Sequence, residues 1–431
     1  MMSSKEGETL RQMKDSGVEW IGMIPATWTL NKISAIYEER NEKVSDRDFS
    51  PLSVTKQGVV PQLETAAKTD NGDNRKLIRK NDFVINSRSD RRGSCGISDY
   101  NGSCSLINTV LKPRQNMCNA YYSFVFRSEP FADEFYRWGN GIVDDLWSTK
   151  WNNMKRIYIP SPDIEEQQRI AEFLDRKCQR IDAVIARQQE AIEKLKAYKL
   201  SVITEAVTKG LNPAVAMKDS GIEWIGQIPA HWYMHKFCWD YSAMLGKMLD
   251  AKRVKGNSLH PYIKNADVQW FSINSMDLDE MDFDESETER YSVKAGDLMI
   301  CEGGEIGKCA IVPVDFPEGI YYQKALHRVR KRTDKSGNIE FLAYLMFVMA
   351  KNNCFNTSPE KATIAHLPGD ALSQLRIPAP PFEEQCTIVE HLHGKCESID
   401  KAVYYRTEVV QKLTEYKKSL IYEVVTGKRE V

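Results

Sequence analysis

The stretch from Asp163 to Gly210 constrains the fold more than any other part of this 431-residue chain, because it predicts one uninterrupted helix. Asp163 is placed to cap the first turn, and Glu166, three residues later, completes the pattern of a capping box. Two prolines hold the preceding backbone extended. Gly210, followed by Pro213, supplies the stop. At about 1.5 Å per residue, such a helix is roughly 70 Å long.

Apolar residues recur along this helix with heptad spacing, and the same pattern returns 218 residues later. One amphipathic helix alone would be explained by ordinary core packing. Two narrow a/d seams in one register instead predict that the helices pair as an intramolecular antiparallel coiled coil, which would act as a rigid spacer. The predicted seam residues are Leu174, Ile181, Ile185, Ile192, Leu195, Val202, Leu392, Ile399, Val403, Val410, Leu413 and Leu420.

A second repeat precedes each helix. Residues 13–28 and 217–232 are identical at all but three positions and lie 204 residues apart. The inserts between motif and helix, residues 29–158 and 233–376, diverge in side chains, although strands are expected at matching places, 82–86 and 297–301. This contrast indicates a frame that meets one partner twice and inserts that each meet something different. Recombination confined to the inserts would leave the same pattern.

These observations predict an α+β fold: two mixed α/β domains separated by a pair of long antiparallel helices, with a pseudo-two-fold internal repeat. The predicted boundaries are 1–160 for the first mixed α/β domain, 161–212 for the central helix, 213–378 for the second mixed α/β domain and 379–431 for the C-terminal helix. Tryptophans 20, 28, 224 and 232 repeat with the frame, so we assign them to packing between domain and helix.

Composition places the chain among cytoplasmic globular proteins. No apolar run approaches 18 residues, and the N-terminus resembles neither a signal peptide nor a transit peptide. Ten cysteines are then expected to be reduced thiols. The net charge of −1 neither favours nor excludes a nucleic-acid partner. The distribution of charge says more about a nucleic-acid partner than the total does. Basic residues cluster at 75–92 and 328–332, and an acidic stretch at 277–289 cancels them in the net charge.

Catalytic motifs are missing from the sequence. The stretch from Glu302 to Cys309 resembles a phosphate loop but lacks its first glycine and its final serine or threonine. We find no glycine-rich dinucleotide fingerprint, no Asn-Pro-Pro-aromatic motif of amino-methyltransferases, no zincin motif and no Cys-x-x-Cys pair. We therefore expect no catalysis by this chain alone and no bound metal.

The arrangement of repeats and several sequence segments resemble the specificity (S) subunit of a type I restriction-modification system. The matching segments are KDSGVEWIGMIPATW, NDFVINSRSDRRGSCGISDYNG, GDLMICEGGEIGKCAI with QKALHRVR, and IPSPDIEEQQRIAEFLD. The resemblance implies two target recognition domains that each bind half of a split, asymmetric site in double-stranded DNA. It also implies that the helices dock two methyltransferase (M) subunits, which methylate adenine N6, and that restriction (R) subunits join them. S-adenosylmethionine, ATP and Mg are expected only on those partners, and no membrane association is expected.

Candidate DNA contacts follow from residue type. In the first insert, a polar, arginine-rich loop follows a strand, and arginine reads guanine edges while lysine and arginine bind phosphates. In the second, glutamates occupy the matching loop, where they could accept from cytosine N4. A surface or structural role is the alternative for each residue taken singly. The predicted set is Arg75, Lys76, Arg79, Lys80, Ser87, Arg88, Ser89, Arg91, Arg92, Gly93, Glu302, Gly303, Gly304, Glu305, Lys324, His327, Arg328 and Arg330.

Two other classes of function stay open from the sequence. A self-contained restriction or methyltransferase enzyme would need a catalytic motif that the sequence lacks. A coiled-coil assembly protein without a DNA role would use the helices alone.

Overall fold

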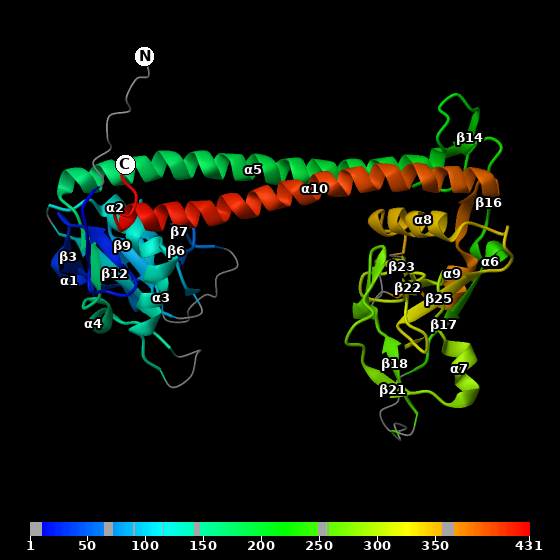
Figure 1. Ribbon diagram of the computed structural model, residues 1–431, viewed down its shortest axis with the longest axis horizontal. Coiled ribbons are helices and arrows are strands. Elements are labelled where there is room, and N and C mark those ends of the chain that lie inside the picture. The colour runs from blue at the N-terminus through cyan, green and yellow to red at the C-terminus, as the bar shows by residue number, and fades with distance from the viewer. Residues whose placement is uncertain are drawn as a thin grey trace, which may run out of the picture. The chain divides into compact units, whose positions relative to one another are not determined.

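The computed structural model describes residues 11–63, 72–88, 91–114, 116–141, 147–248, 256, 258–355 and 366–431. The chain divides into two compact units (Figure 1). Unit 1 comprises Met1–Gln189 and Thr407–Val431, and unit 2 comprises Glu190–Arg406. Each unit combines a mixed α/β part with a segment of both long helices, so the predicted fold class is confirmed. The predicted domain boundaries stay a prediction, because the two units divide in the middle of the long helices, whereas the predicted boundaries lie at the helix ends.

The two long helices are α5 (Ile164–Lys209) and α10 (Phe382–Val425), of 46 and 44 residues. The N–H of Glu166 donates to Asp163 Oδ1 at 2.8 Å, which confirms Asp163 as the cap. The Glu166 carboxylate does not complete the expected capping box. It accepts instead from Trp28 Nε1 at 2.7 Å and from Arg11 at 2.6 Å. Gly210, with φ of +73°, ends α5 in the left-handed conformation that favours glycine.

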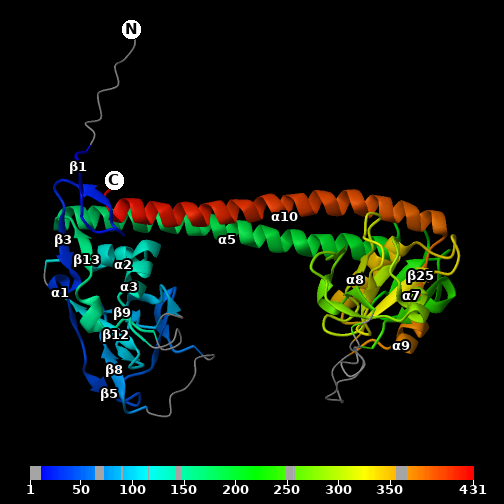
Figure 2. The same cartoon turned by 60° about the horizontal axis from the view of Figure 1, so that its bottom comes forward.

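Within each unit, α5 and α10 lie side by side (Figures 1 and 2). In unit 1, the first turns of α5, with Ile170 and Leu174, share a core with Leu420 and Val424 near the end of α10, so the helices run antiparallel. All the predicted seam residues are buried or half-buried. Most positions between them are exposed, as expected for a seam that faces a partner helix.

Two ion pairs join the helices, one in each unit. Lys417 Nζ lies 2.6 Å from Asp182 in unit 1, and Lys199 Nζ lies 2.7 Å from Asp400 in unit 2. The two aspartates are 218 residues apart, and so are the two lysines. The structure therefore repeats the same cross-helix pair, with the charges on opposite helices.

The mixed α/β part of unit 1 contains a four-stranded sheet and a three-stranded sheet. The first has the order β10 (Cys95–Ile97), β9 (Phe83–Asn86), β12 (Asn108–Pro113), β4 (Tyr37–Glu39), and the second has the order β11 (Gly102–Cys104), β8 (Arg75–Ile78), β5 (Lys43–Val44). Two-stranded pairs are β1 (Met13–Asp15) with β2 (Met23–Pro25), β3 (Thr29–Lys32) with β13 (Tyr158–Ser161), and β6 (Leu52–Thr55) with β7 (Gly58–Pro61). The helices are α1 (Ile33–Ile36), α2 (Asn119–Arg127), α3 (Glu129–Arg137) and α4 (Trp151–Met154).

Unit 2 repeats the four-stranded sheet with other side chains. Its order is β23 (Cys309–Ile311), β22 (Leu298–Cys301), β25 (Leu326–Lys331), β17 (Tyr241–Leu245), and a three-stranded sheet has the order β21 (Glu280–Asp282), β18 (Leu259–Ile263), β24 (Tyr321–Tyr322). The pairs are β14 (Met217–Asp219) with β15 (Gln227–Pro229), β16 (Tyr233–Lys236) with β26 (Arg376–Ala379), and β19 (Val268–Gln269) with β20 (Ser272–Ile273). The helices are α6 (Phe237–Asp240), η3 (Asn265–Asp267), α7 (Glu285–Tyr291), α8 (Ile339–Lys351) and α9 (Gly369–Gln374). The strands predicted at 82–86 and 297–301 are thus both central, as β9 and β22.

A buried glutamine joins insert to helix in the same way in both units. Gln167 Oε1 accepts from the N–H of Cys118 at 2.9 Å, and its Nε2 donates to the Pro162 carbonyl at 2.8 Å. In unit 2, Gln385 Oε1 accepts from the N–H of Asn338 at 2.9 Å and Nε2 donates to the Pro380 carbonyl at 2.8 Å. Each glutamine therefore fixes the start of an insert helix, α2 or α8, against the first turn of a long helix.

The repeated tryptophans pack where the motifs meet the long helices. Trp20 and Trp28 are buried with Leu174 and Val424 in the core of unit 1. Trp232 is buried with Val207 at the end of α5 in unit 2, and Trp224 packs half-buried against the same core. The assignment of these tryptophans to domain-to-helix packing is therefore confirmed.

Truncation of the seam at its two most buried equivalent positions tests this packing. We expect Leu174→Ala and Leu392→Ala each to lower the free energy of unfolding by about 2–5 kcal/mol, because each leaves a cavity between helices. Urea unfolding followed by circular dichroism measures the loss. The exposed Lys177→Ala serves as the control and should change it by less than about 0.5 kcal/mol. Equal stabilities for all three variants would contradict the buried seam.

Candidate nucleic-acid interface

The two predicted reading loops are structurally equivalent. Each leaves the end of a central strand, β9 or β22, and two backbone hydrogen bonds hold its first residue. The N–H of Ser87 donates to the Ile107 carbonyl at 3.2 Å, and the Ser87 carbonyl accepts from Thr149 at 2.9 Å. In unit 2, the N–H of Glu302 donates to Ala325 at 2.9 Å, and its carbonyl accepts from Leu367 at 2.7 Å. The backbone thus presents different side chains at one place in the fold.

The turn that enters each central strand is also shared. The Asp82 carboxylate accepts from the N–H of Arg79 at 2.8 Å and from the Arg40 guanidinium at 2.7 Å. The Asp297 carboxylate likewise accepts from the N–H of Lys294 at 2.8 Å and from Arg330 at 2.5 Å. These buried carboxylates therefore anchor the strand that carries each loop.

The first loop presents its arginines to solvent. Arg88, Arg91 and Arg92 are exposed, whereas Ser87 is buried and shares a hydrogen bond of 2.9 Å with Thr109 Oγ1. Gly93 adopts a φ of +73°, which turns the chain back toward β10. Ser89 lies outside the described residues. The loop can therefore offer guanidinium groups to a partner without unfolding.

Arg92 is positioned more firmly than a free surface arginine. Its guanidinium lies 4.0 Å from the centre of the Tyr136 ring and 3.0 Å from the Asp133 carboxylate. Asp133 and Tyr136 are both on α3, so these contacts restrict the Arg92 side chain while leaving it exposed. Such restriction lowers the entropy that would be lost on binding.

The basic cluster before the first loop divides into two pairs. Arg79 and Lys80 are exposed. Arg75 is only 6% exposed, and its Nε donates to Ser103 Oγ at 2.8 Å. Lys76 is buried, donates to the Asn108 carbonyl at 3.0 Å and lies 3.3 Å from Glu39. The fold gives Arg75 and Lys76 internal roles. Their expected phosphate contacts stay predictions, and the burial argues against them.

The second loop has a different chemical character. Glu302 and Gly303 are half-buried, Gly304 is exposed with a φ of +70°, and Asn265 Nδ2 donates to the Gly303 carbonyl at 2.9 Å. Glu305 accepts from Trp270 Nε1 at 2.8 Å and from Lys351 Nζ at 3.0 Å. The Trp270 hydrogen bond, with the Lys351 ammonium, lowers the pKa of the Glu305 carboxyl group. The loop therefore offers acceptors where the first offers donors.

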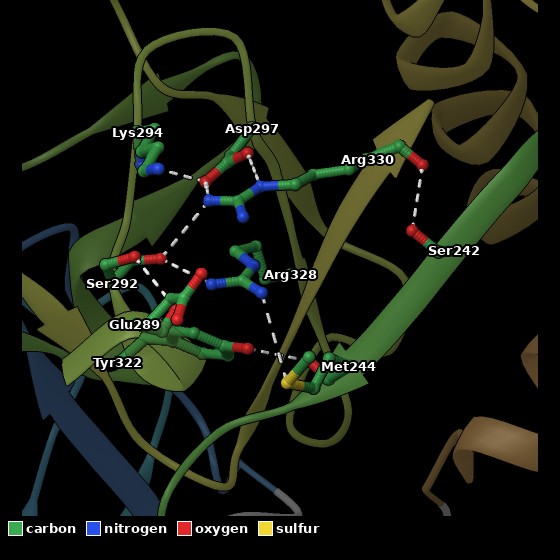
Figure 3. Close-up of polar contacts among 9 residues, drawn as sticks. All are labelled: Ser242, Met244, Glu289, Ser292, Lys294, Asp297, Tyr322, Arg328 and Arg330. Carbon is green, nitrogen blue, oxygen red and sulfur yellow. Dashed lines mark hydrogen bonds and ion pairs between the residues drawn. The ribbon is translucent and has the colours of Figure 1, made fainter. Parts of the chain in front are cut away.

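The basic residues expected to support the second loop are mostly internal (Figure 3). Arg328 is 5% exposed, donates to the Ser292 carbonyl at 2.5 Å and packs on the Tyr322 ring. Arg330 is half-buried and bound to Asp297. Burial lowers the pKa of Arg328, and its guanidinium donates to a carbonyl inside the unit instead of lying at the surface. Phosphate contacts for both stay predictions that this geometry argues against.

Lys324 and His327 differ in exposure. Lys324 is exposed between β24 and β25. His327 is fully buried, and its Nε2 donates to the Leu367 carbonyl at 2.8 Å. His327 thus fixes the segment that also holds Glu302, which makes it a positioning residue for the loop. Among the described residues, no group of three or more histidine, cysteine or acidic side chains is arranged to hold a metal ion.

Comparison with known proteins agrees with this architecture. Residues 245–400 match the family model of the type I restriction modification DNA specificity domain. The matched residues all lie within unit 2. The resemblance stated from the sequence is thereby confirmed.

Specificity subunits of type I restriction enzymes align with this chain over longer stretches than the family model does. The chain is 23% identical over 320 residues to the EcoKI specificity subunit of a type I restriction enzyme from Escherichia coli (strain K12), covering 71% of this chain and 65% of that protein. It is 21% identical over 440 residues to a protein of Methanocaldococcus jannaschii provisionally named type I restriction enzyme MjaX specificity subunit, covering 95% and 96%. The first alignment spans less than two thirds of the E. coli protein.

Solved structures share the fold over nearly the whole chain. A chain from a structure described as the structural basis of complex assembly and conformational transition of the type I R-M system superposes with a TM-score of 0.72 at 15% identity, covering 94% of this chain and 99% of that one. The HsdS subunit from Thermoanaerobacter tengcongensis superposes with a TM-score of 0.51 at 15% identity, covering 94% and 98%. At this identity the likeness concerns fold.

The burial of His327 predicts an acid sensitivity of unit 2. Burial lowers the pKa of His327, although the hydrogen bond to Leu367 opposes the shift. As pH falls below about 6.5, the unfolded chain takes up a proton that the folded chain does not, so stability declines until the lowered pKa is reached. We expect His327→Gln, which keeps a donor to Leu367, to lose less stability than the parent chain between pH 7 and 5. Parallel pH profiles of the urea midpoint would contradict this account.

Proposed function

We propose that this chain is the DNA-sequence-specificity subunit of a type I restriction-modification complex. It binds a bipartite, asymmetric DNA site through the inserts of its two units. The observation that carries the proposal is the pair of equivalent loops: one backbone position presents arginines after β9 and glutamates after β22. Donor-rich and acceptor-rich loops suit different base edges, so each unit reads a different half-site.

The exposed members of the predicted set carry DNA contact in this proposal. In unit 1 these are Arg79, Lys80, Arg88, Arg91 and Arg92. In unit 2 the loop from Glu302 to Glu305 reads bases, and Lys324 contacts phosphate. The buried basic side chains hold the scaffold that presents these residues.

The proposal assigns the chemistry to other subunits. The chain itself is non-catalytic, holds no cofactor and works in the cytoplasm. Two methyltransferase subunits dock on the paired helices with their S-adenosylmethionine, and restriction subunits that use ATP and Mg join them. The repeated cross-helix ion pairs support this, because one frame surface presented twice suits two copies of one partner. No helix in the described ranges combines the length and apolarity required to cross a bilayer.

Two alternatives are distinguished by simple measurements. A self-contained restriction or methyltransferase enzyme would transfer labelled methyl groups from S-adenosylmethionine to DNA without a partner subunit. A coiled-coil assembly protein without a DNA role would not retain DNA at low salt.

Removal of the loop arginines tests the proposal. Full-length chain is used to select bound duplexes from a random pool, which yields the two half-sites. Arg88→Ala, Arg91→Ala and Arg92→Ala combined should weaken binding to the selected duplex about tenfold or more and abolish discrimination at one half-site only. Fluorescence anisotropy against duplexes with either half-site scrambled measures both effects.

A matched variant controls for the loss of three positive charges. Arg176→Ala, Lys177→Ala and Arg180→Ala combined remove the same charge from exposed positions on α5 and should keep discrimination at both half-sites. Equal loss at both half-sites in the loop variant, or no loss at either, would contradict the proposed division of labour.

A further inference from the structure

A second segment of unit 1, Ser148–Asn152, lies against the arginine loop. Ser148 forms an isolated antiparallel bridge with Arg88, and the N–H of Thr149 donates to the Ser87 carbonyl at 2.9 Å. Thr149 Oγ1 also donates to the Phe135 carbonyl at 2.6 Å, which ties the segment to α3. The segment is therefore held in place by backbone bonds, even though about 60 residues separate it from the loop.

The segment and the loop enclose a cleft of about 440 Å³. Its floor contains the buried side chains of Lys76, Ser87 and Thr109, and its rim includes Arg88, Lys150 and Asn152, which are all exposed. Among the described lining residues, Glu39 supplies the carboxylate, and it is paired with Lys76 at 3.3 Å. Since the Lys76 charge is balanced in this way, the two exposed cations give the rim a positive character.

One wall of the cleft is apolar and exposed. Leu106 and Ile107, in the turn between β11 and β12, are 42% and 38% exposed. The ring of Trp151 lines another part. A cleft that combines cations, an amide and exposed aliphatic groups matches the groove face of DNA, where phosphates, base edges and thymine methyls lie close together.

Unit 2 has the same backbone arrangement but carries no basic side chain at the positions equivalent to Lys150 and Asn152. The N–H of Leu367 bonds to the Glu302 carbonyl, as that of Thr149 bonds to Ser87, and these donors are 218 residues apart. Pro368 and the exposed Asp370 therefore stand where unit 1 has Lys150 and Asn152. The second segment thus differs between the units in the same sense as the loops do.

We propose that Lys150 and Asn152 are DNA-binding residues of unit 1: Lys150 contacts a phosphate, and Asn152 determines specificity by contacting a base edge within the half-site that the Arg88–Arg92 loop reads. This inference rests on the proposed function. Asn152 Oδ1 accepts from Lys155 Nζ at 3.0 Å, which orients the amide and leaves its N–H groups as donors to DNA. Among the described residues, no side-chain ion pair engages Lys150, so its ammonium group is available to a phosphate.

The test uses full-length variants and duplexes selected from a random pool by the parent chain. Lys150→Ala should weaken binding for every duplex alike and reduce the slope of log Kd against log salt by about one. Asn152→Ala should lower the preference at one base pair of the first half-site by about fivefold or more and leave the second half-site unchanged. Both side chains are exposed, so circular dichroism should show intact folds.

Matched controls are Lys177→Ala for the lost charge and Asn31→Ala for the lost amide, since both residues are exposed outside the cleft. If Lys150→Ala and Asn152→Ala bind within twofold of these controls while the loop arginine variant loses its half-site, the inference is overturned and the proposed function stands. If the parent chain itself selects no sequence, the proposed function is overturned, and this inference with it.

Discussion

The structure depends on burial of a narrow apolar stripe that neither long helix could cover alone. A helix of 46 residues with exposed polar flanks has little tertiary support except from another helix laid along its seam. The chain supplies that helix itself, 218 residues later, and each unit pairs one segment of α5 with one segment of α10. Unit 1 is therefore incomplete without residues from the far end of the chain.

The need to pair the two long helices fixes the residues of the frame and leaves the side chains of the inserts free to differ. The glutamine joints of Gln167 and Gln385, the buried tryptophans and the cross-helix ion pairs all belong to the frame and recur in both units. The four-stranded sheets keep their order and their carboxylate-anchored turns. The side chains after β9 and β22 differ in chemistry, and so do those of the segments at 148–152 and 366–370 that lie against them. A fixed backbone with replaceable side chains at one edge is suited to reading different sequences with one architecture.

Local signals in the sequence predicted the frame well. The heptad spacing, the cap at Asp163 and the strands that became β9 and β22 depend on residues near one another, so a short stretch is enough to identify them. The matching places of the two loops followed from the strands predicted at 82–86 and 297–301, which each loop follows. Even the altered role of Glu166 is instructive: it sits where a capping box predicts it, but Trp28, 138 residues earlier, provides a buried donor that takes its carboxylate.

The candidate site was predicted less completely, because exposure depends on distant residues. Arg75 and Arg79 belong to one basic run, yet Ser103 takes the first into the interior while the second stays at the surface. Arg328 is buried against Ser292 and Tyr322, although the sequence around it reads as a charged strand. The sequence did not place Lys150 and Asn152 at the site, since only the folded backbone brings their segment to Arg88.

The most direct test of the account duplicates one insert. Residues 33–157, between β3 and β13, are replaced by residues 237–375, which lie between the equivalent strands β16 and β26. The frame is unchanged, so the chimera should fold, and the duplexes it selects from a random pool should carry two copies of one half-site. If the chimera selected the parent's two different half-sites, this would contradict the claim that the inserts recognise the DNA sequence and the frame only holds them.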